Sequence, residues 1–382
     1  GSVWMENGEI IAIGSTSELE ALYGERSHEA DVIDASGRLV TPGLVDPHTH
    51  VAYGGSRERE FEMRLEGSTY MEIMNAGGGI HATTRMTREA TEDELVAQTT
   101  RRLDSFLAHG VTTVEGKSGY GLDLETELKQ LRAMKRLNET HPIDLVPTFM
   151  GGHAVPQEYK GSEEQYIDLL VNDMLPKVAK EGLAVFNDVF CEVGVFTPEQ
   201  SERILEAGKK LGLIPKIHAD EIESYGGAEL AAKVGAISAE HLLKASDEGV
   251  RLMAEAGVIA CLLPATALYL REEAAKGRAM IDAGVAVAIS TDCNPGSSPT
   301  TSMPLVMNLA CISMRLTPAE ALVAATMNAA CAIGMEEKVG SLEVGKQADV
   351  VMWNVSNYQE LQYLFGVNHV NIVWKKGVQV VG

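Results

Sequence analysis

Hydrophobic and polar positions follow two patterns, one in the middle of the chain and one at both ends. Between residues 43 and 340, short apolar runs alternate with longer segments in which apolar residues recur every three or four positions. The short runs are typical of buried strands and the longer segments of amphipathic helices. Eight strands are predicted, at 44–51, 112–115, 144–149, 186–190, 215–219, 238–241, 258–262 and 286–291.

Helical segments occupy the intervals between these strands. Regular alternation of strands and helices predicts a parallel sheet with helical crossovers, and eight such units predict an α/β fold of the (β/α)8 TIM barrel type. An open, doubly wound sheet is the alternative, but no G-x-G-x-x-G motif opens the first crossover helix. The predicted helices are 92–109, 124–138, 164–180, 198–211, 226–234, 247–256 and 272–283, followed by 304–314 and 318–328.

The two ends of the chain show short strand patterns without intervening long helices. Asn7-Gly8 is a strong signal for a two-residue hairpin turn. Neither end is long enough to bury a core alone. We therefore expect residues 1–42 and 341–382 to form one composite β-sandwich beside a barrel of residues 43–340. The strands predicted at the ends are 3–6, 9–13, 31–34, 349–353, 370–374 and 378–381.

Composition restricts the classes of partner. The chain has 382 residues, a hydrophobic content of 45% and a formal net charge of −22. Because nucleic acids and anionic membranes attract Lys and Arg, this charge argues against both as partners. The five cysteines form no C-x-x-C pair, which favours free thiols in a reducing cytoplasm. No apolar run is long enough for a membrane span, and because the sequence starts without Met we expect natural residues before Gly1.

The strongest chemical signal follows the first predicted strand, where His48 and His50 are separated by one residue. Side chains two apart on a strand share a face, so both imidazoles can reach one divalent ion. Such a pair also occurs by chance on a wet surface. Function in a TIM barrel lies at the carboxyl ends of the strands, and there the chain places His218, His241 and Asp292. This set of imidazole and carboxylate groups suits zinc or ferrous iron.

Two residues of this region have alternative interpretations. His241 is either a core histidine bonded to a backbone carbonyl or a group that stands beside the metal and stabilises what binds there, since the other four residues could complete the ligand set. Glu221 follows His218 by three residues. It can approach a metal-bound water without being a ligand, which suits proton transfer. A solvated loop carboxylate is its alternative interpretation.

Several short motifs are shared with a known family. The broader ones are TPGLVDPHTH at 41–50 and GSLEVGKQADVV at 340–351. On all of these motifs together, the chain resembles the imidazolonepropionase family of the amidohydrolase superfamily over essentially its whole length. The narrower motifs are GGSR at 54–57, GGG at 77–79, KSGYG at 117–121, FMGGH at 149–153, HADE at 218–221 and DCNPGS at 292–297.

This resemblance implies a metal-dependent hydrolase that opens the ring of 4-imidazolone-5-propanoate to N-formimidoyl-L-glutamate. It implies one Zn²⁺ or Fe²⁺/Fe³⁺ per subunit, because residues 186–190 contain no lysine that could bridge a second ion, and it implies a homodimer. Some family members carry Gln at the position of Glu221. The implied metal ligands are His48, His50, His218 and Asp292, and the implied substrate-binding residues are Arg57, Tyr120, His153, Glu221, Asn294, Gly296 and Ser297.

The substrate-binding residues also have a physical rationale. Arg57 offers a planar, permanently charged fork for a carboxylate, although pairing with Glu58 or Glu60 is its alternative role. Tyr120 sits between two glycines, so its hydroxyl can lie over a ligand. His153 follows a Gly-Gly pair and can donate to a carbonyl oxygen. A loop aromatic and a structural loop histidine are the alternatives for these two residues.

The expected reaction is hydrolysis, in which a water activated by the metal attacks the cyclic amide carbonyl. Asp292 and Glu221 are the candidate proton carriers, and His241 would stabilise the developing oxyanion. The nearest alternative is another cyclic-amide hydrolase or a deaminase of the same superfamily, such as one acting on cytosine or guanine. In a nucleobase site, Arg57 and Tyr120 would have no carboxylate to bind. A noncatalytic metal carrier is the alternative from another class, and no feature of the sequence favours it.

Overall fold

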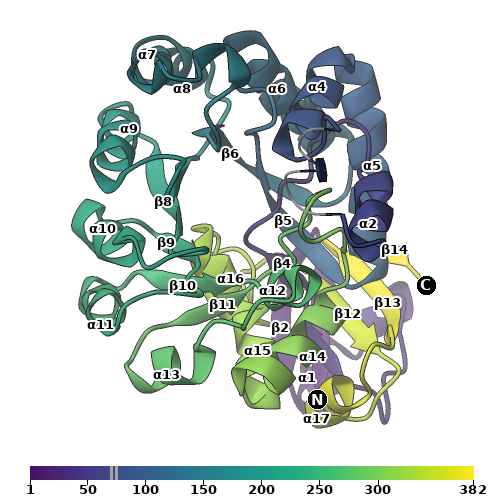
Figure 1. The fold of residues 1–382 in the computed structure, drawn as a ribbon. Coiled ribbons are helices and arrows are strands. Elements are labelled where there is room, and N and C mark those ends of the chain that lie inside the picture. Colours follow the sequence, from purple (N-terminus) through teal and green to yellow (C-terminus); the bar gives the residue numbers. More distant parts are fainter. Residues whose placement is uncertain (69–71, 74–75) are drawn as a thin grey trace.

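The computed structural model describes residues 1–68, 72–73 and 76–382. Its centre is a sheet of eight parallel strands that curve into a nearly closed barrel, each strand pairing with its neighbours in chain order (Figure 1). The predicted TIM-barrel fold is therefore confirmed. The strands are β4 (Leu44–Asp46), β5 (Val111–Lys117), β6 (Asp144–Gly152), β7 (Phe186–Cys191), β8 (Ile214–Ala219), β9 (Ser238–His241), β10 (Ile259–Leu262) and β11 (Val287–Ile289).

The first and last strands of the barrel are joined by side-chain and loop contacts. Asp46 accepts hydrogen bonds from the hydroxyls of Ser290 and Thr291, the latter at 2.6 Å. Beyond the strands, the amide of His50 donates to the carbonyl of Cys293 at 3.0 Å. These contacts bring the segment after β4 and the segment after β11 together at one face of the barrel.

Strand β4 is shorter than the predicted strand 44–51. Pro47 follows it directly and has no amide hydrogen for the ladder. The chain nevertheless stays close to β5, since the amide of Lys117 donates to the carbonyl of Thr49 at 2.8 Å. His48 and His50 therefore lie on an extended segment just beyond the strand.

Helices surround the barrel on the outside (Figure 1). The predicted helix 164–180 is divided into α7 (Glu163–Leu169), a π-helical turn at Leu170–Met174 and α8 (Leu175–Glu181). None of the helices described is both long and apolar enough to cross a membrane. The helices that follow the barrel strands are α5 (Glu92–Ala108), α6 (Leu124–Thr140), α7 (Glu163–Leu169), α8 (Leu175–Glu181), α9 (Pro198–Lys210), α10 (Gly227–Val234), α11 (Asp247–Ala256), α13 (Gly277–Asp282), α14 (Met303–Met314), α15 (Pro318–Ala324) and α16 (Met327–Ala332).

Several short helices differ from the prediction. The predicted helix 272–283 is replaced by the shorter α13, and α12 (Pro264–Leu270) precedes it. Pro264 occupies the first turn of α12, where its fixed φ favours a helix start. Both helices are shorter than the window of about 11–18 residues in which helical periodicity can be recognised, which is why the pattern missed α12 and misplaced the start of α13. The other helices that were not predicted are α1 (Thr16–Tyr23), α2 (Glu58–Leu65), α4 (Ile80–Glu89) and α17 (Tyr358–Tyr363).

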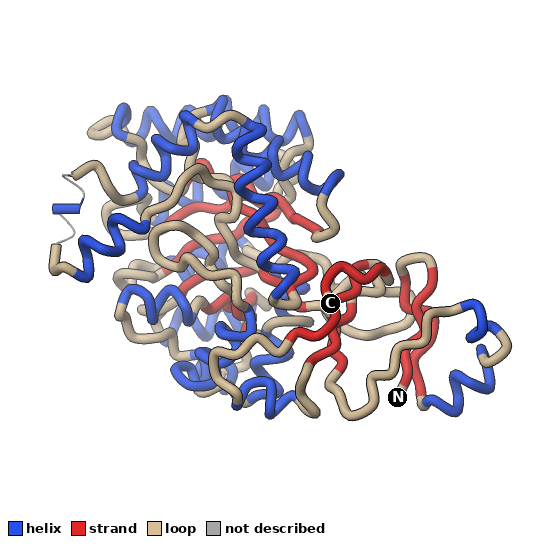
Figure 2. Tube along the Cα trace, turned by 90° about the vertical axis from the view of Figure 1, so that its right-hand side faces the viewer, coloured by secondary structure: helices blue, strands red, loops and turns tan. Residues whose placement is uncertain are grey.

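The two ends of the chain form small antiparallel sheets beside the barrel, as Figure 2 shows. One sheet contains strands from both ends, in the order β14-β13-β12-β3, and the other is the hairpin β1-β2. The amide of Ile10 donates to the carbonyl of Lys346 at 2.9 Å and links the two ends. The strands are β1 (Ser2–Glu6), β2 (Glu9–Gly14), β3 (Val40–Pro42), β12 (Val350–Trp353), β13 (Val370–Lys375) and β14 (Val378–Val381).

The strand predicted at 31–34 is wrong. Val32 and Ile33 are 76% and 48% exposed, and the Asp34 carboxylate accepts the amide of Ser36 at 2.9 Å, which is a local turn. The N-terminal strand that joins the sheet built from both ends of the chain is β3 instead. It pairs with β12 and buries Thr41, whereas residues 32 and 33 gain no such burial.

Candidate metal centre and substrate cavity

Three predicted ligand histidines converge at the face of the barrel where the strands end. One nitrogen of each of His48, His50 and His218 lies within 4.8 Å of the others. Nε2 of His50 is 3.3 Å from Nε2 of His218. Oδ1 of Asp292 lies 3.5 Å from Nε2 of His48 and 3.7 Å from Nε2 of His50. The four side chains predicted as ligands therefore lie around one point.

The donor set fits a divalent metal ion. Four ligands about 2.0–2.2 Å from a tetrahedral zinc ion are about 3.3–3.6 Å from one another, which is close to the three nitrogen and oxygen separations above. Nε2 of His48 is buried and has no hydrogen-bond partner among the described residues, so its lone pair is available. Burial lowers the pKa of His48 and of His50 well below the usual range, which keeps both rings neutral, as metal ligation requires.

The rings of two of these histidines are held from behind by buried carboxylates. Nδ1 of His48 bonds Glu240, and Nδ1 of His218 lies 3.1 Å from Oδ2 of Asp188. A carboxylate that accepts the Nδ1 hydrogen leaves Nε2 as the ligating atom and sets the ring direction. Glu240 thus directs the ring of His48, and Asp188 directs the ring of His218, toward the common centre.

His241 and Glu221 lie beside this centre. The ring centroid of His241 is 5.2 Å from that of His218, and Nδ1 of His241 has no hydrogen-bond partner among the described residues. The interpretation as a core histidine bonded to a carbonyl is thus not supported for Nδ1. Nδ1 lies 3.4 Å from Oε1 of Glu221. Burial, with Asp292 and Glu192 adding to it, raises the pKa of Glu221 to about 8.

Asp292 is positioned by its own backbone and by a hydroxyl. It follows β11 with a φ of 52°, an uncommon conformation for a non-glycine residue. Its Oδ2 accepts the hydroxyl of Thr266 at 2.7 Å, which leaves Oδ1 directed to the histidines. Burial raises the pKa of Asp292 to about 6. This carboxylate therefore offers Oδ1 for a cation, and a carboxylate can also accept a proton.

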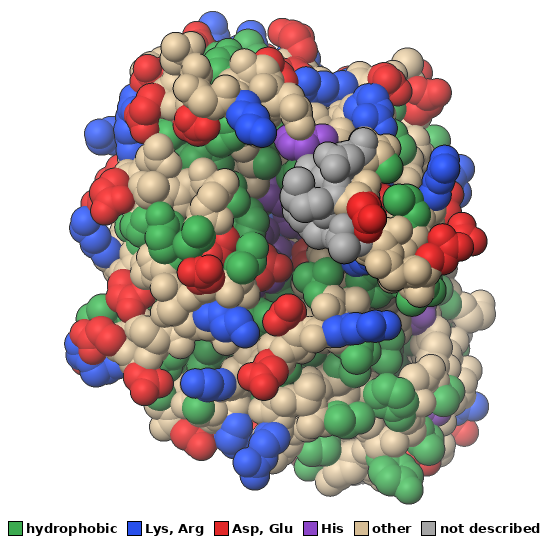
Figure 3. Space-filling view, in the orientation of Figure 1, with side chains coloured by type: hydrophobic (Ala, Val, Ile, Leu, Met, Phe, Trp, Pro, Cys, Tyr) green, Lys and Arg blue, Asp and Glu red, His purple; other side chains and the backbone are tan. Residues whose placement is uncertain are grey.

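A cavity of about 820 Å³ opens at this centre, and Figure 3 shows histidines at the bottom of a hollow on the face in view. Its lining includes all residues predicted to bind substrate. Arg57 lies at the start of α2 and pairs with Glu60, with Nη2 2.7 Å and Nε 3.0 Å from Oε2. A Cβ on Gly296 would come within 2.3 Å of Nη1 of Arg57, so a glycine is required for this close approach. Arg57 thus pairs with Glu60, which was its alternative role, and also lines the cavity, so its binding of a substrate carboxylate stays a prediction.

Tyr120 and His153 form one wall of the cavity next to His50. The His153 ring stacks on His50 with centroids 4.7 Å apart, and Tyr120 lies 5.2 Å from His153. Nδ1 of His153 is 3.0 Å from the carbonyl of Gly119, which can only accept, so Nδ1 carries the hydrogen. Burial lowers the pKa of His153 to about 3, and the neutral ring offers Nε2 as an acceptor. In this neutral form Nε2 can accept a hydrogen bond, whereas the expected donation to a carbonyl oxygen would need a protonated ring.

The loop after Asp292 is shaped by Asn294. Its Oδ1 accepts the amides of Gly296 and Ser297, both at 2.8 Å, and its Nδ2 donates to the carbonyl of Asp292 at 2.8 Å. The Asn294 side chain therefore holds the loop against the ligand aspartate, while Gly296 and Ser297 line the cavity.

Buried charges that support the site were not predicted individually. Glu127 on α6 accepts the amides of Gly119, Gly121 and Leu122, and so holds the loop that carries Tyr120. A charged residue inside an apolar run is the sequence signal that could have indicated them, since a charged side chain is buried only when it has partners. Side chains of this kind in the barrel strands are Asp46, Glu115, Lys117, Asp188, Lys216 and Glu240, all fully buried.

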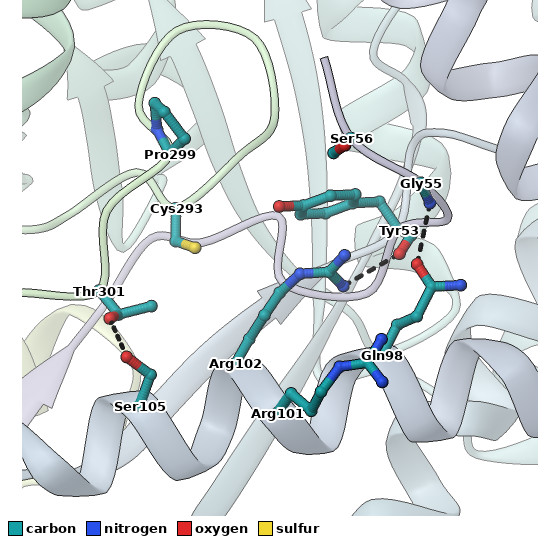
Figure 4. A pocket seen from close by; sticks show the side chains of 10 residues that line it. All are labelled: Tyr53, Gly55, Ser56, Gln98, Arg101, Arg102, Ser105, Cys293, Pro299 and Thr301. Atoms are coloured by element: carbon teal, nitrogen blue, oxygen red, sulfur yellow. Dashed lines mark hydrogen bonds between the residues drawn. The ribbon is translucent and has the colours of Figure 1, made fainter. Parts of the chain in front are cut away.

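A second cavity of about 540 Å³ lies beside the first and shares no lining residue with it. Figure 4 shows Arg102 over Tyr53 and the thiol of Cys293 at its wall. Arg102 lies 3.4 Å from the centre of the Tyr53 ring and donates to the carbonyls of Val51 and Tyr53. Cys293 thus points away from the histidines, as expected for the residue after a ligand. All five cysteines are free.

The sequence of this chain is similar to known amidohydrolases over nearly its whole length. The model of the amidohydrolase family matches residues 39–380. The imidazolonepropionase of Brevibacillus brevis is 65% identical over 381 residues, covering 100% of this chain and 90% of that protein. The imidazolonepropionase of Geobacillus kaustophilus is 64% identical with the same coverage.

Solved structures at lower identity share the fold. The 5-methylcytosine deaminase from Klebsiella pneumoniae, liganded with phosphonocytosine, has a TM-score of 0.77 at 17% identity and covers 99% of this chain and 94% of that one. An adenosine deaminase from Xanthomonas campestris with bound zinc has a TM-score of 0.72 at 20% identity, covering 99% and 87%. Together with the sequence matches, these findings show that the chain belongs to the amidohydrolase family, in the group that contains the imidazolonepropionases.

Proposed function

We propose that this enzyme hydrolyses 4-imidazolone-5-propanoate to N-formimidoyl-L-glutamate with one divalent metal ion, zinc or iron. One observation carries the proposal: a single cavity is lined by the predicted ligands His50, His218 and Asp292 and by the arginine fork of Arg57, and His48 meets the first group from behind. The first group suits a metal and the second a carboxylate. The high identity to imidazolonepropionases over the full chain supports the same substrate.

His48, His50, His218 and Asp292 would hold the ion through three Nε2 atoms and Oδ1. A bound divalent ion lowers the pKa of a water toward about 7 and polarises a carbonyl oxygen. Asp292 would accept a proton at a carboxylate oxygen, since this carboxylate lies where the activated water would be held. Glu221 faces the same cavity and would carry the proton to the departing ring nitrogen.

The other side chains of the cavity would bind and orient the substrate. His241 would stabilise negative charge that develops on the carbonyl oxygen. Nε2 of His153 would accept a ring N–H, because Nδ1 is committed to Gly119. Burial raises the pKa of Tyr120 well above its usual range, so its hydroxyl remains a donor. Arg57, held by Glu60, would bind the propanoate carboxylate.

Turnover tests the proposal directly. The purified, metal-loaded protein should consume 4-imidazolone-5-propanoate, which can be followed as loss of ring absorbance and as appearance of N-formimidoyl-L-glutamate. The amide of the propanoate side chain is a matched control, because it removes the charge that Arg57 binds and keeps the ring. Hydrolysis of cytosine or guanine with no turnover of the imidazolone would instead make this chain a nucleobase deaminase.

Replacing Arg57 by Met should raise KM much more than it lowers kcat. A charge-assisted hydrogen bond is worth about 1.5–3 kcal/mol, which corresponds to a loss of roughly 10- to 150-fold in kcat/KM. Steady-state kinetics on the imidazolone measures both constants. Arg59→Met is the matched control, because Arg59 is exposed on the same helix.

Arg57→Met removes the ion-pair partner of the buried Glu60, which keeps the amide of Gly79 as a donor at 3.1 Å. Thermal unfolding must therefore show that Arg57→Met is folded under assay conditions. Arg57→Lys keeps a positive charge but loses the fork and should give an intermediate KM. An unchanged KM in folded Arg57→Met would remove Arg57 from the carboxylate subsite.

A further inference from the structure

Lys117 carries a fully buried ammonium at the carboxyl end of β5. Its Nζ lies 2.7 Å from Oδ2 of Asp188, 2.8 Å from Oε1 of Glu115 and 3.9 Å from Oε2 of Glu240. It lines neither of the two cavities described above. Lys117 therefore does not contact a ligand in the cavity, and any effect it has on the site must pass through its three carboxylate partners.

Two of these partners each hold a ligand histidine. Asp188 accepts Nδ1 of His218, and Glu240 accepts Nδ1 of His48. The carboxylates come from different strands, β7 and β9, and the ammonium contacts both. Buried carboxylates repel each other at short range unless a cation lies between them. The position of Lys117 thus keeps both supports in place at once.

The third partner, Glu115, holds the segment between His48 and His50. Oε2 of Glu115 accepts the amide of Thr49 at 3.3 Å, and the Thr49 hydroxyl donates to the carbonyl of Glu115 at 2.7 Å. The amide of Lys117 itself donates to the carbonyl of Thr49 at 2.8 Å. Thr49 lies between His48 and His50, so β5 fixes the backbone that presents both rings.

We propose that Lys117 is a positioning residue for the metal centre, which ties together the supports of all three ligand histidines. Through Asp188 it directs His218, through Glu240 it directs His48, and through Glu115 it holds the backbone on both sides of Thr49. The inference rests on the proposed metal-dependent function. It extends that function from the four ligand side chains to the cation that contacts all three supporting carboxylates.

The chain offers a matched control in Lys216 of β8. Its side chain is also fully buried, but its Nζ donates to the carbonyls of Pro47 and Ala332, at 3.1 Å and 3.3 Å. Of the three carboxylates, it approaches Glu240, with 3.7 Å between Nζ and Oε1. Lys216→Met therefore removes a buried cation of the same kind without separating Asp188 from its partner.

The experiment compares Lys117→Met and Lys216→Met in the full-length protein. The dissociation constant for Zn²⁺ is measured by competition with a chelator, and the visible absorption of the Co²⁺-substituted protein reports the ligand geometry. Loss of an outer support costs about 10- to 100-fold in metal affinity, so Lys117→Met should bind Zn²⁺ that much more weakly and show an altered Co²⁺ spectrum. Lys216→Met takes a cation from Glu240 alone, so its loss of affinity and its spectral change should be clearly smaller than those of Lys117→Met, whatever its thermal stability.

Three results would decide against the inference. These are parent-like affinity and spectrum in Lys117→Met, equal losses of affinity in both lysine variants, or, if Lys117→Met does not fold, parent-like affinity and spectrum in Glu115→Gln. The last variant keeps the contact between Lys117 and Asp188 and removes only the charge of Glu115, so it is the milder change. A parent protein that binds no divalent metal would overturn the proposed function, which is a separate outcome.

Discussion

Replacing Asp292 by Asn should lower kcat for 4-imidazolone-5-propanoate by about 10²- to 10⁴-fold, the usual contribution of a positioned acid–base group. The amide keeps an oxygen that can face His48 and His50, as Oδ1 does at 3.5 and 3.7 Å. It cannot accept a proton. The variant should therefore retain much of its metal while losing turnover, and elemental analysis beside steady-state kinetics separates the two quantities.

Asp220→Asn is the matched control for this change. Asp220 is another buried aspartate, two residues after His218, but its oxygens accept the amides of residues 225–228 at the start of α10. Its substitution should lower stability and leave kcat of the folded protein near that of the parent. Full turnover in Asp292→Asn at parent metal content would show that the proton moves by another group, with Glu221 as the next candidate.

Removing the metal with a chelator should abolish measurable turnover, because a divalent ion activates water at neutral pH far more strongly than a carboxylate or imidazole side chain does. Adding Zn²⁺ or Fe²⁺ back to the chelated protein should restore activity. The two metals are compared by the kcat that each restores at equal occupancy, and this comparison addresses the choice between zinc and iron.

Thermal unfolding should respond in the same experiment. A ligand that binds the folded state at 1,000 times its dissociation constant stabilises it by about 4 kcal/mol, so the Tm should rise on reloading. His48→Ala is the control that should regain neither activity nor Tm, since it lacks one ligand nitrogen. Chelated protein that keeps the full rate, with no metal detected by elemental analysis, would contradict a metal-dependent reaction.

The positions of the main site residues could be predicted from the sequence because a parallel barrel brings all strand ends to one face. His48, His50, His218 and Asp292 follow different strands and meet, as expected, around one point. The strand at 31–34 could not be excluded in this way. Strand formation there depends on a pairing partner far along the chain, and β12 pairs with residues 40–42 instead.

The interior charges show a second limit of sequence reasoning. Lys117 reads as part of a loop motif after a strand, and nothing in the local pattern identifies its partners. Its three carboxylates lie on β5, β7 and β9, between 2 and 123 positions away along the chain. A pattern of apolar and polar residues reports which side chains are buried, but not which charges are paired.

The sequence by itself determined the fold class, the residue types at the strand ends and the family, because these follow from periodicity, order along the chain and local motifs. The tertiary structure alone decided which atoms do the binding. It shows that His153 offers Nε2 as an acceptor, that Glu60 holds Arg57, and that buried carboxylates direct the ligand rings. These properties depend on hydrogen bonds of about 3 Å between side chains from distant strands, and such distances arise only when the barrel is assembled.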